Sequence, residues 1–163
     1  MIMTTQDQQI VDSIIKIRLN IDKLLNSFQF LAPSREVSLA KTSLQFAFAW
    51  LGESMKCLGS ETPYVESENP ASDKIEPQAD HAENDFRNEL SEIENTQVAK
   101  VKLFRAKLTE VISDINNEFG AIGAYLEFNT ILHYAKKSAT EAKFSFGWEL
   151  GRLRDESNKP ELS

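Results

Sequence analysis

The first part of the chain carries a regular pattern of apolar residues between Gln6 and Leu31. Apolar side chains recur there in alternating steps of four and three, the spacing of one face of a helix. These positions are Ile10, Ile14, Ile17, Ile21, Leu24, Phe28 and Leu31. The pattern stops at Ala32-Pro33-Ser34, because proline disfavours helical geometry in the preceding residue and serine is a good N-cap for a following helix.

A second helix is predicted from about Arg35 to Leu58, with Gly59 ending it. Its seam consists of Val37, Ala40, Leu44, Ala47, Leu51, Met55 and Leu58. Two such helices joined by a short turn predict an antiparallel helical hairpin over residues 1–60. Since two helices alone bury too little apolar area to be stable in water, the hairpin needs either self-association or docking on the second half of the chain.

Residues 61–80 lack any periodic apolar pattern. They contain Pro63, Pro70 and Pro77 among many acidic residues, which is typical of a flexible, solvated linker.

Helical periodicity returns in the C-terminal region, residues 81–163. A third helix is expected to begin near Phe86 and to continue to Ile122, with a kink at glycines 120 and 123. Ser138 and Glu141 have the spacing of a capping box and predict a last helix that ends near Asp155.

An aromatic motif occurs twice in the chain. Residues 45–51 and 143–150 both contain aromatic–small–aromatic–small–Trp, offset by 98 positions. The C-terminal region is therefore either a diverged second hairpin or an unrelated helical region. Against duplication, the helix breaks do not align at this offset, and neither Arg35 nor Lys41 has a basic counterpart.

The composition agrees with an all-α fold, because 41% of the residues are hydrophobic while only six glycines and five prolines interrupt the chain. No stretch approaches the roughly twenty apolar residues that a membrane span requires, so no membrane partner is expected. The single cysteine, Cys57, can form no internal disulfide and no secretory leader pattern is present, which predicts a reducing cytoplasm.

The net charge of −7 is distributed unevenly along the chain. Residues 1–60 carry six Lys/Arg and five Asp/Glu, residues 61–80 carry one and six, and residues 81–163 carry eleven and fourteen. Most of the acidity thus lies in the middle segment, while the first unit is nearly neutral. This distribution excludes DNA and long RNA as partners but allows a small anion to bind the first unit.

The residues needed for catalysis or metal binding are scarce in the sequence. His81 and His133 are isolated, and no second histidine or cysteine lies at metal-ligand spacing. The sequence therefore predicts a non-enzymatic protein without a metal or cofactor. Cys57 is expected to be a buried residue rather than a reactive thiol.

Polar residues at the start of the second helix resemble an anion cradle. The set consists of Ser34, Arg35, Ser38, Lys41, Thr42 and Gln45. The helix N-terminus favours phosphate, the two cations add charge and the hydroxyls can donate hydrogen bonds. The alternative is a capped helix with an ordinary solvent-facing polar side. Nearby, Phe46 and Trp50 share another face of the helix, which suits either an oligomer contact or the stacking of a base.

The segment 33–51, PSREVSLAKTSLQFAFAWL, resembles the hairpin signature of phage anti-CBASS and Thoeris anti-defence proteins. The resemblance covers residues 6–60. Members of that family are small helical proteins that oligomerise and sequester cyclic nucleotides or cyclic ADP-ribose variants without cleaving them. It implies that Arg35, Ser38, Lys41 and Thr42 lie near a pocket shared between protomers. This chain departs from the pattern by carrying a linker and a second helical region.

These observations predict an oligomeric helical bundle that binds a cyclic nucleotide signal in the host cell cytoplasm and so keeps an immune effector inactive. The expected ligand-binding residues are the six of the cradle together with Trp50. The alternative is a helical-bundle structural or protein-interaction module without a small-molecule ligand, in which the apolar seams bind a partner or a second copy.

Overall fold

The computed structural model describes residues 4–59, 86–119 and 126–158, and the regular secondary structure among them is helical, with no strand. The four long helices of this part of the chain are α1 (Thr5–Asn26), α2 (Arg35–Cys57), α4 (Gln97–Asn116) and α5 (Leu126–Ser157). A single 3-10 turn, η1 (Ser27–Phe30), follows α1, and residues 86–92 form a short helix before α4. The predicted all-α fold class is confirmed.

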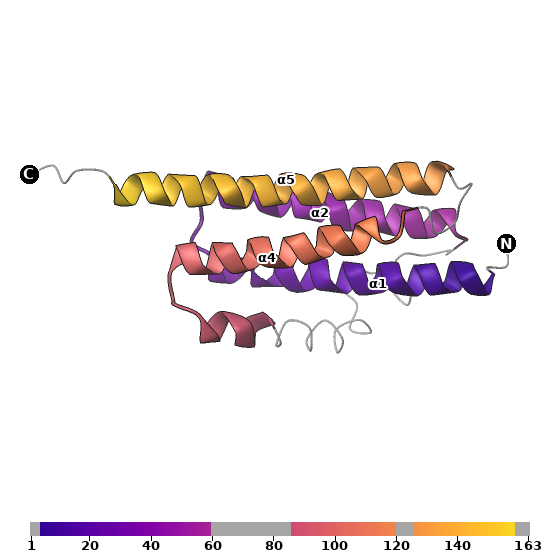
Figure 1. The fold of residues 1–163 in the computed structure, drawn as a ribbon, viewed down its shortest axis with the longest axis horizontal. Coiled ribbons are helices and arrows are strands. Elements are labelled where there is room, and N and C mark those ends of the chain that lie inside the picture. Colours follow the sequence, from indigo (N-terminus) through magenta and orange to yellow (C-terminus); the bar gives the residue numbers. More distant parts are fainter. Residues whose placement is uncertain (1–3, 60–85, 120–125, 159–163) are drawn as a thin grey trace, which may run out of the picture.

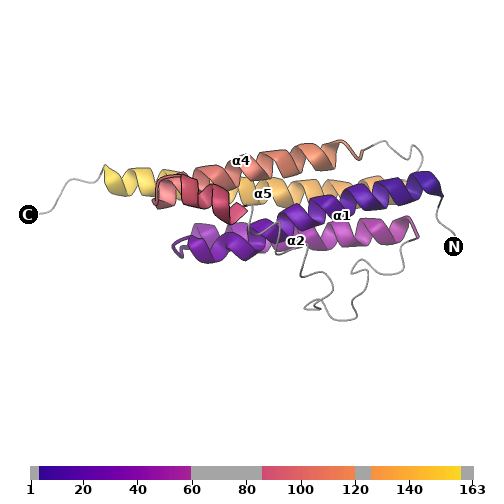
Figure 2. The same cartoon turned by 90° about the horizontal axis from the view of Figure 1, so that it is seen from below.

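The long helices lie side by side in a bundle (Figure 1). Each is antiparallel to its neighbours: α2 and α4 run in one direction, and α1 and α5 run in the other. The view from below shows the same arrangement (Figure 2). The most extensive packing is between α2 and α5, followed by α4 with α5, α1 with α2, and α1 with α4. Of the two ways to cover the first two helices, the structure therefore shows docking on the second half of the chain.

The starts of α1, α2 and α4 are fixed by side-chain caps. The Thr4 hydroxyl accepts a hydrogen bond from the Asp7 backbone N–H at 3.0 Å, and the Asp7 carboxylate accepts one from the Thr4 backbone N–H at 3.4 Å. Ser34 caps α2 as predicted, and Thr96 caps α4 by accepting from the Ala99 N–H at 3.1 Å. Each cap satisfies backbone donors that have no partner within the helix.

Two predicted helix boundaries were wrong. The third helix does not run unbroken from Phe86, because the helical stretch 86–92 ends before Thr96 starts α4. The last helix does not begin at Ser138, because Ser138 lies inside α5 and is buried. Phe128, Leu132 and Ala135 continue the seam of Ala139, Ala142 and Phe146, so burial of one continuous face extends the helix through a sequence that resembles a cap.

Several predictions fall outside the described residues. The acidic linker 61–80, His81 and the kink at glycines 120 and 123 all lie there. The described helices contain no segment long and apolar enough to cross a membrane.

Small and aromatic residues fill different parts of the core. Ala40, Ala47, Ala139 and Ala142 are fully buried, and they belong to α2 and α5, the helix pair with the most extensive packing. At the other extreme, the Phe104 ring lies 5.1–5.5 Å from three further phenylalanine rings, measured between centroids. Those rings belong to Phe28, Phe86 and Phe146, so one aromatic cluster joins η1, the short helix, α4 and α5.

The repeated aromatic motif has partly equivalent surroundings in α2 and α5. At the offset of 98, Leu44 and Ala142 are both buried, and Phe46 and Phe144 are both exposed. The tryptophans differ, because Trp50 is half-buried and Trp148 is exposed. Burial thus repeats at several matched positions, and duplication stays a hypothesis.

Candidate functional site

The structure places most of the predicted site residues on the outside of α2. Five of them are exposed along the helix: Arg35, Ser38, Lys41, Thr42 and Gln45. The other two, Ser34 and Trp50, are half-buried, and both contact α5. The predicted set therefore divides into an exposed row and two residues that join α2 to α5.

Ser34 takes part in an internal polar network. Its hydroxyl accepts a hydrogen bond from the Val37 backbone N–H at 3.1 Å and donates one to Glu149 Oε1 at 3.0 Å. The hydroxyl is thus engaged in both directions within the chain. The anion at the start of α2 is the carboxylate of Glu149.

Glu149 is fully buried and is surrounded by donors. Gln97 Nε2 donates to its Oε2 at 3.0 Å, while Arg152 donates from Nε at 2.8 Å and from Nη2 at 3.0 Å. The same Gln97 amide pairs with Ala32, accepting from its backbone N–H at 2.8 Å and donating to its carbonyl at 3.0 Å. Since Ser34 and Gln97 stand at the first turns of α2 and α4, the buried carboxylate faces the positive ends of two helix dipoles.

Burial alone would raise the pKa of Glu149, but the hydrogen bonds from Arg152, Gln97 and Ser34 hold the pKa below its ordinary value of 4.5. The carboxylate is therefore ionised at neutral pH. Arg152 completes its own contacts with Glu156 at 2.7 Å and Glu36 at 3.6 Å, so the network's charges are paired across α2 and α5. A buried charge of this kind is tolerated only because it is fully hydrogen-bonded.

The exposed row on α2 combines cations, hydroxyls and an aromatic ring. Ser38, Thr42 and Phe46 follow one another at four-residue spacing, and Arg35 lies three residues before Ser38, so the four side chains lie along one side of the helix. Lys41 and Gln45 form a second, adjoining line. The arrangement presents two positive charges and two hydroxyl groups to solvent beside an uncovered ring.

Trp50 is held by an aromatic contact with α5. Its ring lies 4.9 Å from that of Tyr134, centroid to centroid, with the planes inclined by 32°. The ring is therefore a surface contact between α2 and α5 rather than part of the row that contains Thr42.

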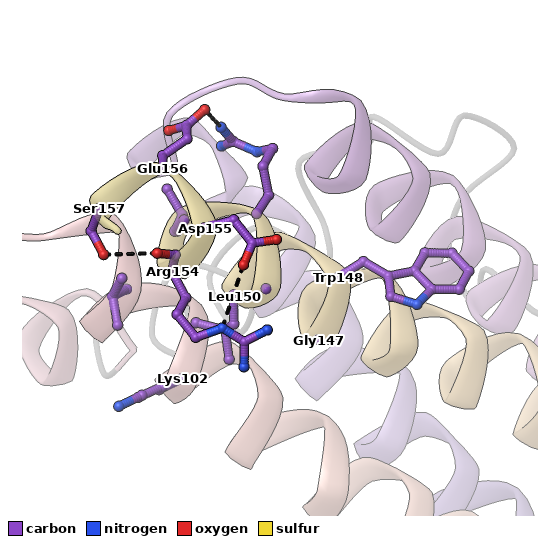
Figure 3. Close-up of a pocket in the computed structure, with 12 residues that line it drawn as sticks. Lys102, Gly147, Trp148, Leu150, Arg154, Asp155, Glu156 and Ser157 are labelled. Atoms are coloured by element: carbon purple, nitrogen blue, oxygen red, sulfur yellow. Dashed lines mark hydrogen bonds and ion pairs between the residues drawn. The ribbon is translucent and has the colours of Figure 1, made fainter. Parts of the chain in front are cut away.

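A broad groove of about 1140 Å³ lies elsewhere, between the start of α4 and the last turns of α5 (Figure 3). Lys102 comes from α4, whereas Trp148, Arg154 and Asp155 come from α5. In the close-up, Trp148 points away from Arg154 and Asp155, which form an ion pair at 3.7 Å. The groove thus offers paired charges on one side and an exposed indole on the other.

The remaining titratable groups offer little chemistry. Burial raises the pKa of the Cys57 thiol, helped by the nearby charges of Glu127 and Glu53, so the reactive thiolate is disfavoured at neutral pH. The His133 ring packs on Phe119 at 5.0 Å between centroids. Among the residues that the structure describes, no three His, Cys, Asp or Glu side chains are grouped so that they could hold a metal ion.

Comparison with known proteins identified no relative of this chain. No family model, curated protein or solved structure matches the chain.

The residues of the internal network were not among the site residues predicted from the sequence. Glu149 could have been found, because it occupies the next seam position after Ala142 and Phe146, where an apolar residue is expected. Gln97 and Arg152 carry no such pattern, since their roles depend on the meeting of α2, α4 and α5. Arg18 is a similar case: it is buried in α1, with its guanidinium 4.0 Å from the centre of the Phe48 ring on α2.

Proposed function

We propose that this protein binds and sequesters a cyclic nucleotide immune signal, a cyclic oligonucleotide or a cyclic ADP-ribose variant, without cleaving it. In this proposal it is a phage anti-defence protein that acts in the host cell cytoplasm as a homo-oligomer. The observation that carries the proposal is the exposed row of α2, in which Arg35, Ser38 and Thr42 adjoin the uncovered ring of Phe46.

The chemistry of this row suits a phosphorylated ligand that carries a base. Arginine and lysine form charge-assisted hydrogen bonds with phosphate oxygens, and serine and threonine hydroxyls can add further donors. An exposed aromatic ring offers a flat surface on which a base can stack. Because Glu149 already occupies the start of α2, the proposed ligand contacts Arg35, Ser38, Lys41 and Thr42 along the helix rather than the helix terminus.

The proposal assigns binding rather than catalysis to this surface. The row supplies cations, hydroxyls and the Gln45 amide, whereas hydrolysis of a phosphodiester needs a positioned base or a metal-activated water. Intact ligand should accordingly be recovered after the complex is heated. Recovery of a linear or shortened product would identify an enzyme instead.

Titration calorimetry against a panel of cyclic dinucleotides, cyclic trinucleotides and cyclic ADP-ribose isomers tests the proposal directly. Lys41→Glu should weaken binding at least tenfold, which corresponds to about 1.4 kcal/mol, because it replaces an attractive charge with a repulsive one. The matched control is Lys102→Glu, which makes the same change at an exposed lysine of α4 and should leave binding unchanged. If wild-type protein takes up none of the panel at micromolar concentrations, the proposal is wrong.

A second candidate is a protein-interaction module without a small-molecule ligand. The observation that favours it is the number of large apolar side chains left exposed on α2 and α5, among them Phe46, Phe144 and Trp148. Such a module would bind its partner equally well after Lys41→Glu, provided that these apolar side chains were kept.

A further inference from the structure

The outer surface of the α2–α5 pair exposes an unusual number of large apolar side chains. The exposed fractions are 41% for Leu39 and 57% for Phe46 on α2, and 47% for Tyr134, 60% for Phe144 and 64% for Trp148 on α5. Apolar groups that gather on one face in this way mark an interaction surface more often than chance exposure does.

Two contacts fix which residues of the antiparallel helices lie at the same level. Ser34 Oγ donates to Glu149 Oε1 at 3.0 Å near one end, and the Trp50 and Tyr134 rings meet at 4.9 Å near the other. Both helices rise by about 1.5 Å per residue. A residue a given number of positions after Ser34 therefore lies opposite the residue the same number of positions before Glu149.

This register pairs residues of complementary chemistry across the surface. Arg35 is level with Trp148 and Leu39 with Phe144, one and five positions from the Ser34–Glu149 contact. Eight positions along, Thr42 is level with Glu141; twelve positions along, Phe46 is level with Lys137. All eight side chains are exposed. Each level thus joins a cation to an aromatic ring, two apolar groups, or a hydroxyl to a carboxylate.

The side chains also share one face of their helices. Leu39 and Phe46 are seven residues apart on α2, as are Lys137 and Phe144 on α5, and Trp148 follows Phe144 by four. Residues at these spacings lie on the same side of a helix. Lys41, only two residues after Leu39, points to a different side.

We infer that this α2–α5 face binds a second copy of the same chain, with the two-fold axis parallel to the bundle. The α2 of each subunit then lies on the α5 of the other at the same level. Leu39 packs on the partner's Phe144, Arg35 lies over the partner's Trp148, and Lys137 lies over the partner's Phe46.

Complementarity is what selects a second copy as the occupant. In a two-fold interface every contact occurs twice, so a surface must be complementary to itself. The four levels meet this condition, because each group on α2 finds a suitable partner at its own level on α5. The cation–aromatic contacts become stronger when the surrounding surface is desolvated. The inference specifies an interface for the homo-oligomer of the proposed function, but it does not depend on the ligand, since the association requires none. Dimerisation covers Arg35, Thr42 and Phe46, so in the dimer the proposed ligand would reach the row from the side of Ser38 and Lys41.

Mass measurement in solution, by light scattering or sedimentation without ligand, is the first test. At about 50 µM the wild-type chain should have a mass of about 37 kDa, twice the 18.5 kDa of one chain. Phe144→Glu or Leu39→Glu should give a monomer of unchanged helicity, because both side chains are already exposed and no core contact is lost. The matched control is Val98→Glu on α4, also exposed, which should leave the dimer intact.

Disulfide trapping tests the register itself. In a Cys57→Ser background, a chain with Leu39→Cys is mixed with a chain with Phe144→Cys and oxidised. The mixture should form a covalent dimer, whereas Leu39→Cys alone should form little, because the two copies of residue 39 do not meet. A monomeric wild type, or trapping by Leu39→Cys alone as efficient as in the mixture, would overturn the inference.

The experiments distinguish failure of the ligand proposal from failure of the dimer inference. Lys41 points away from the α2–α5 face, so Lys41→Glu should remain dimeric even where it abolishes ligand binding. Loss of the dimer in Phe144→Glu with calorimetric binding retained would leave the ligand proposal standing. A dimer that binds no cyclic nucleotide would leave the interface standing and remove the proposed ligand.

Discussion

Glu149 is a buried charged residue whose desolvation cost is offset by its hydrogen-bond partners. It stands at a seam position of α5, where an apolar side chain would need no partners, and its burial costs hydration energy. Ser34, Gln97 and Arg152 offset that cost by donating to both carboxylate oxygens. The result is a junction in which losing any one partner leaves a buried charge incompletely satisfied.

Replacing this carboxylate by an amide should expose the size of the effect. Glu149→Gln is expected to lower the free energy of unfolding by about 2 kcal/mol at neutral pH, the usual value for hydrogen bonds to a charged group. The amide keeps the shape of the side chain but loses the ionic hydrogen bonds to Arg152. Urea unfolding followed by circular dichroism would measure the difference. Glu156→Gln, at an exposed partner of Arg152, should change the free energy of unfolding by much less.

The same variant makes the pH dependence of this junction measurable. Because the pKa of Glu149 is lowered on folding, its contribution to stability is complete above the ordinary value of 4.5 and is lost as the pH falls through the lowered value. The difference in unfolding free energy between wild type and Glu149→Gln should therefore shrink from about pH 7 to about pH 3. An equal difference at both pH values would show that the carboxylate is not held ionised by its partners.

At this scale the sequence predicted the surroundings of part of the candidate site. The exposure of Arg35, Lys41 and Thr42 follows from their distance from the seam, and the cap at Ser34 follows from its place after proline. The anion at that cap could not be foreseen as Glu149, because nothing local to residues 30–60 indicates which residue 115 positions away will reach it.

At the scale of elements, α5 is longer than its sequence suggests, and it contains two glycines in its last half. Glycine in a helix interior costs conformational entropy relative to alanine. A Cβ at Gly151 would meet no atom within 4 Å, whereas one at Gly147 would lie 3.8 Å from the Arg105 guanidinium, an ordinary contact distance. Neither position needs glycine for space or for backbone geometry.

Gly151→Ala should therefore stabilise the protein by about 0.5–1 kcal/mol. The gain comes from fewer conformations in the unfolded chain and from better helix propensity. Thermal unfolding at matched protein concentration would measure it. Gly147→Ala is a useful companion, with a gain that is smaller if the Arg105 side chain has to move. A destabilised Gly151→Ala would mean that this side of α5 is covered in solution.

The apolar seams explain which helix boundaries the sequence could predict. The start of α2 was predicted because proline, serine and the first seam residue coincide, and Ser34 does cap it. The start of α5 was not, since Ser138 and Glu141 match a cap while the buried seam continues past them towards the N-terminus as far as Phe128. Where a local cap pattern and a continuous buried face predict different helix starts, the buried face decides, because its burial contributes more to stability than a single cap does.

On the scale of the whole molecule, the first two helices depend on the second half of the chain. Because α2 packs more extensively on α5 than on α1, a fragment of residues 1–60 should show far less helix than it has in the full chain. Adding a fragment of residues 86–163 should restore helical circular dichroism at 222 nm. A fragment of residues 1–60 that was fully helical and monomeric by itself would show that the hairpin is independently stable.

The packing of α2 from the first half of the chain on α5 from the second half could not be derived from periodicity alone. The seams show that each helix has one apolar side, and this predicts a bundle. They do not show that α5, rather than α1, is the main neighbour of α2, because a seam shows which side of a helix is apolar and not which other seam it meets.

The phenylalanine cluster around Phe104 predicts which residues homologous proteins should retain. Four phenylalanines from widely separated parts of the chain, at positions 28, 86, 104 and 146, meet in one cluster, so altering any of them disturbs several segments at once. Surface residues can drift under far weaker constraint. Distant homologues of this protein should therefore keep aromatic residues at these four positions even where the rest of their sequences has diverged.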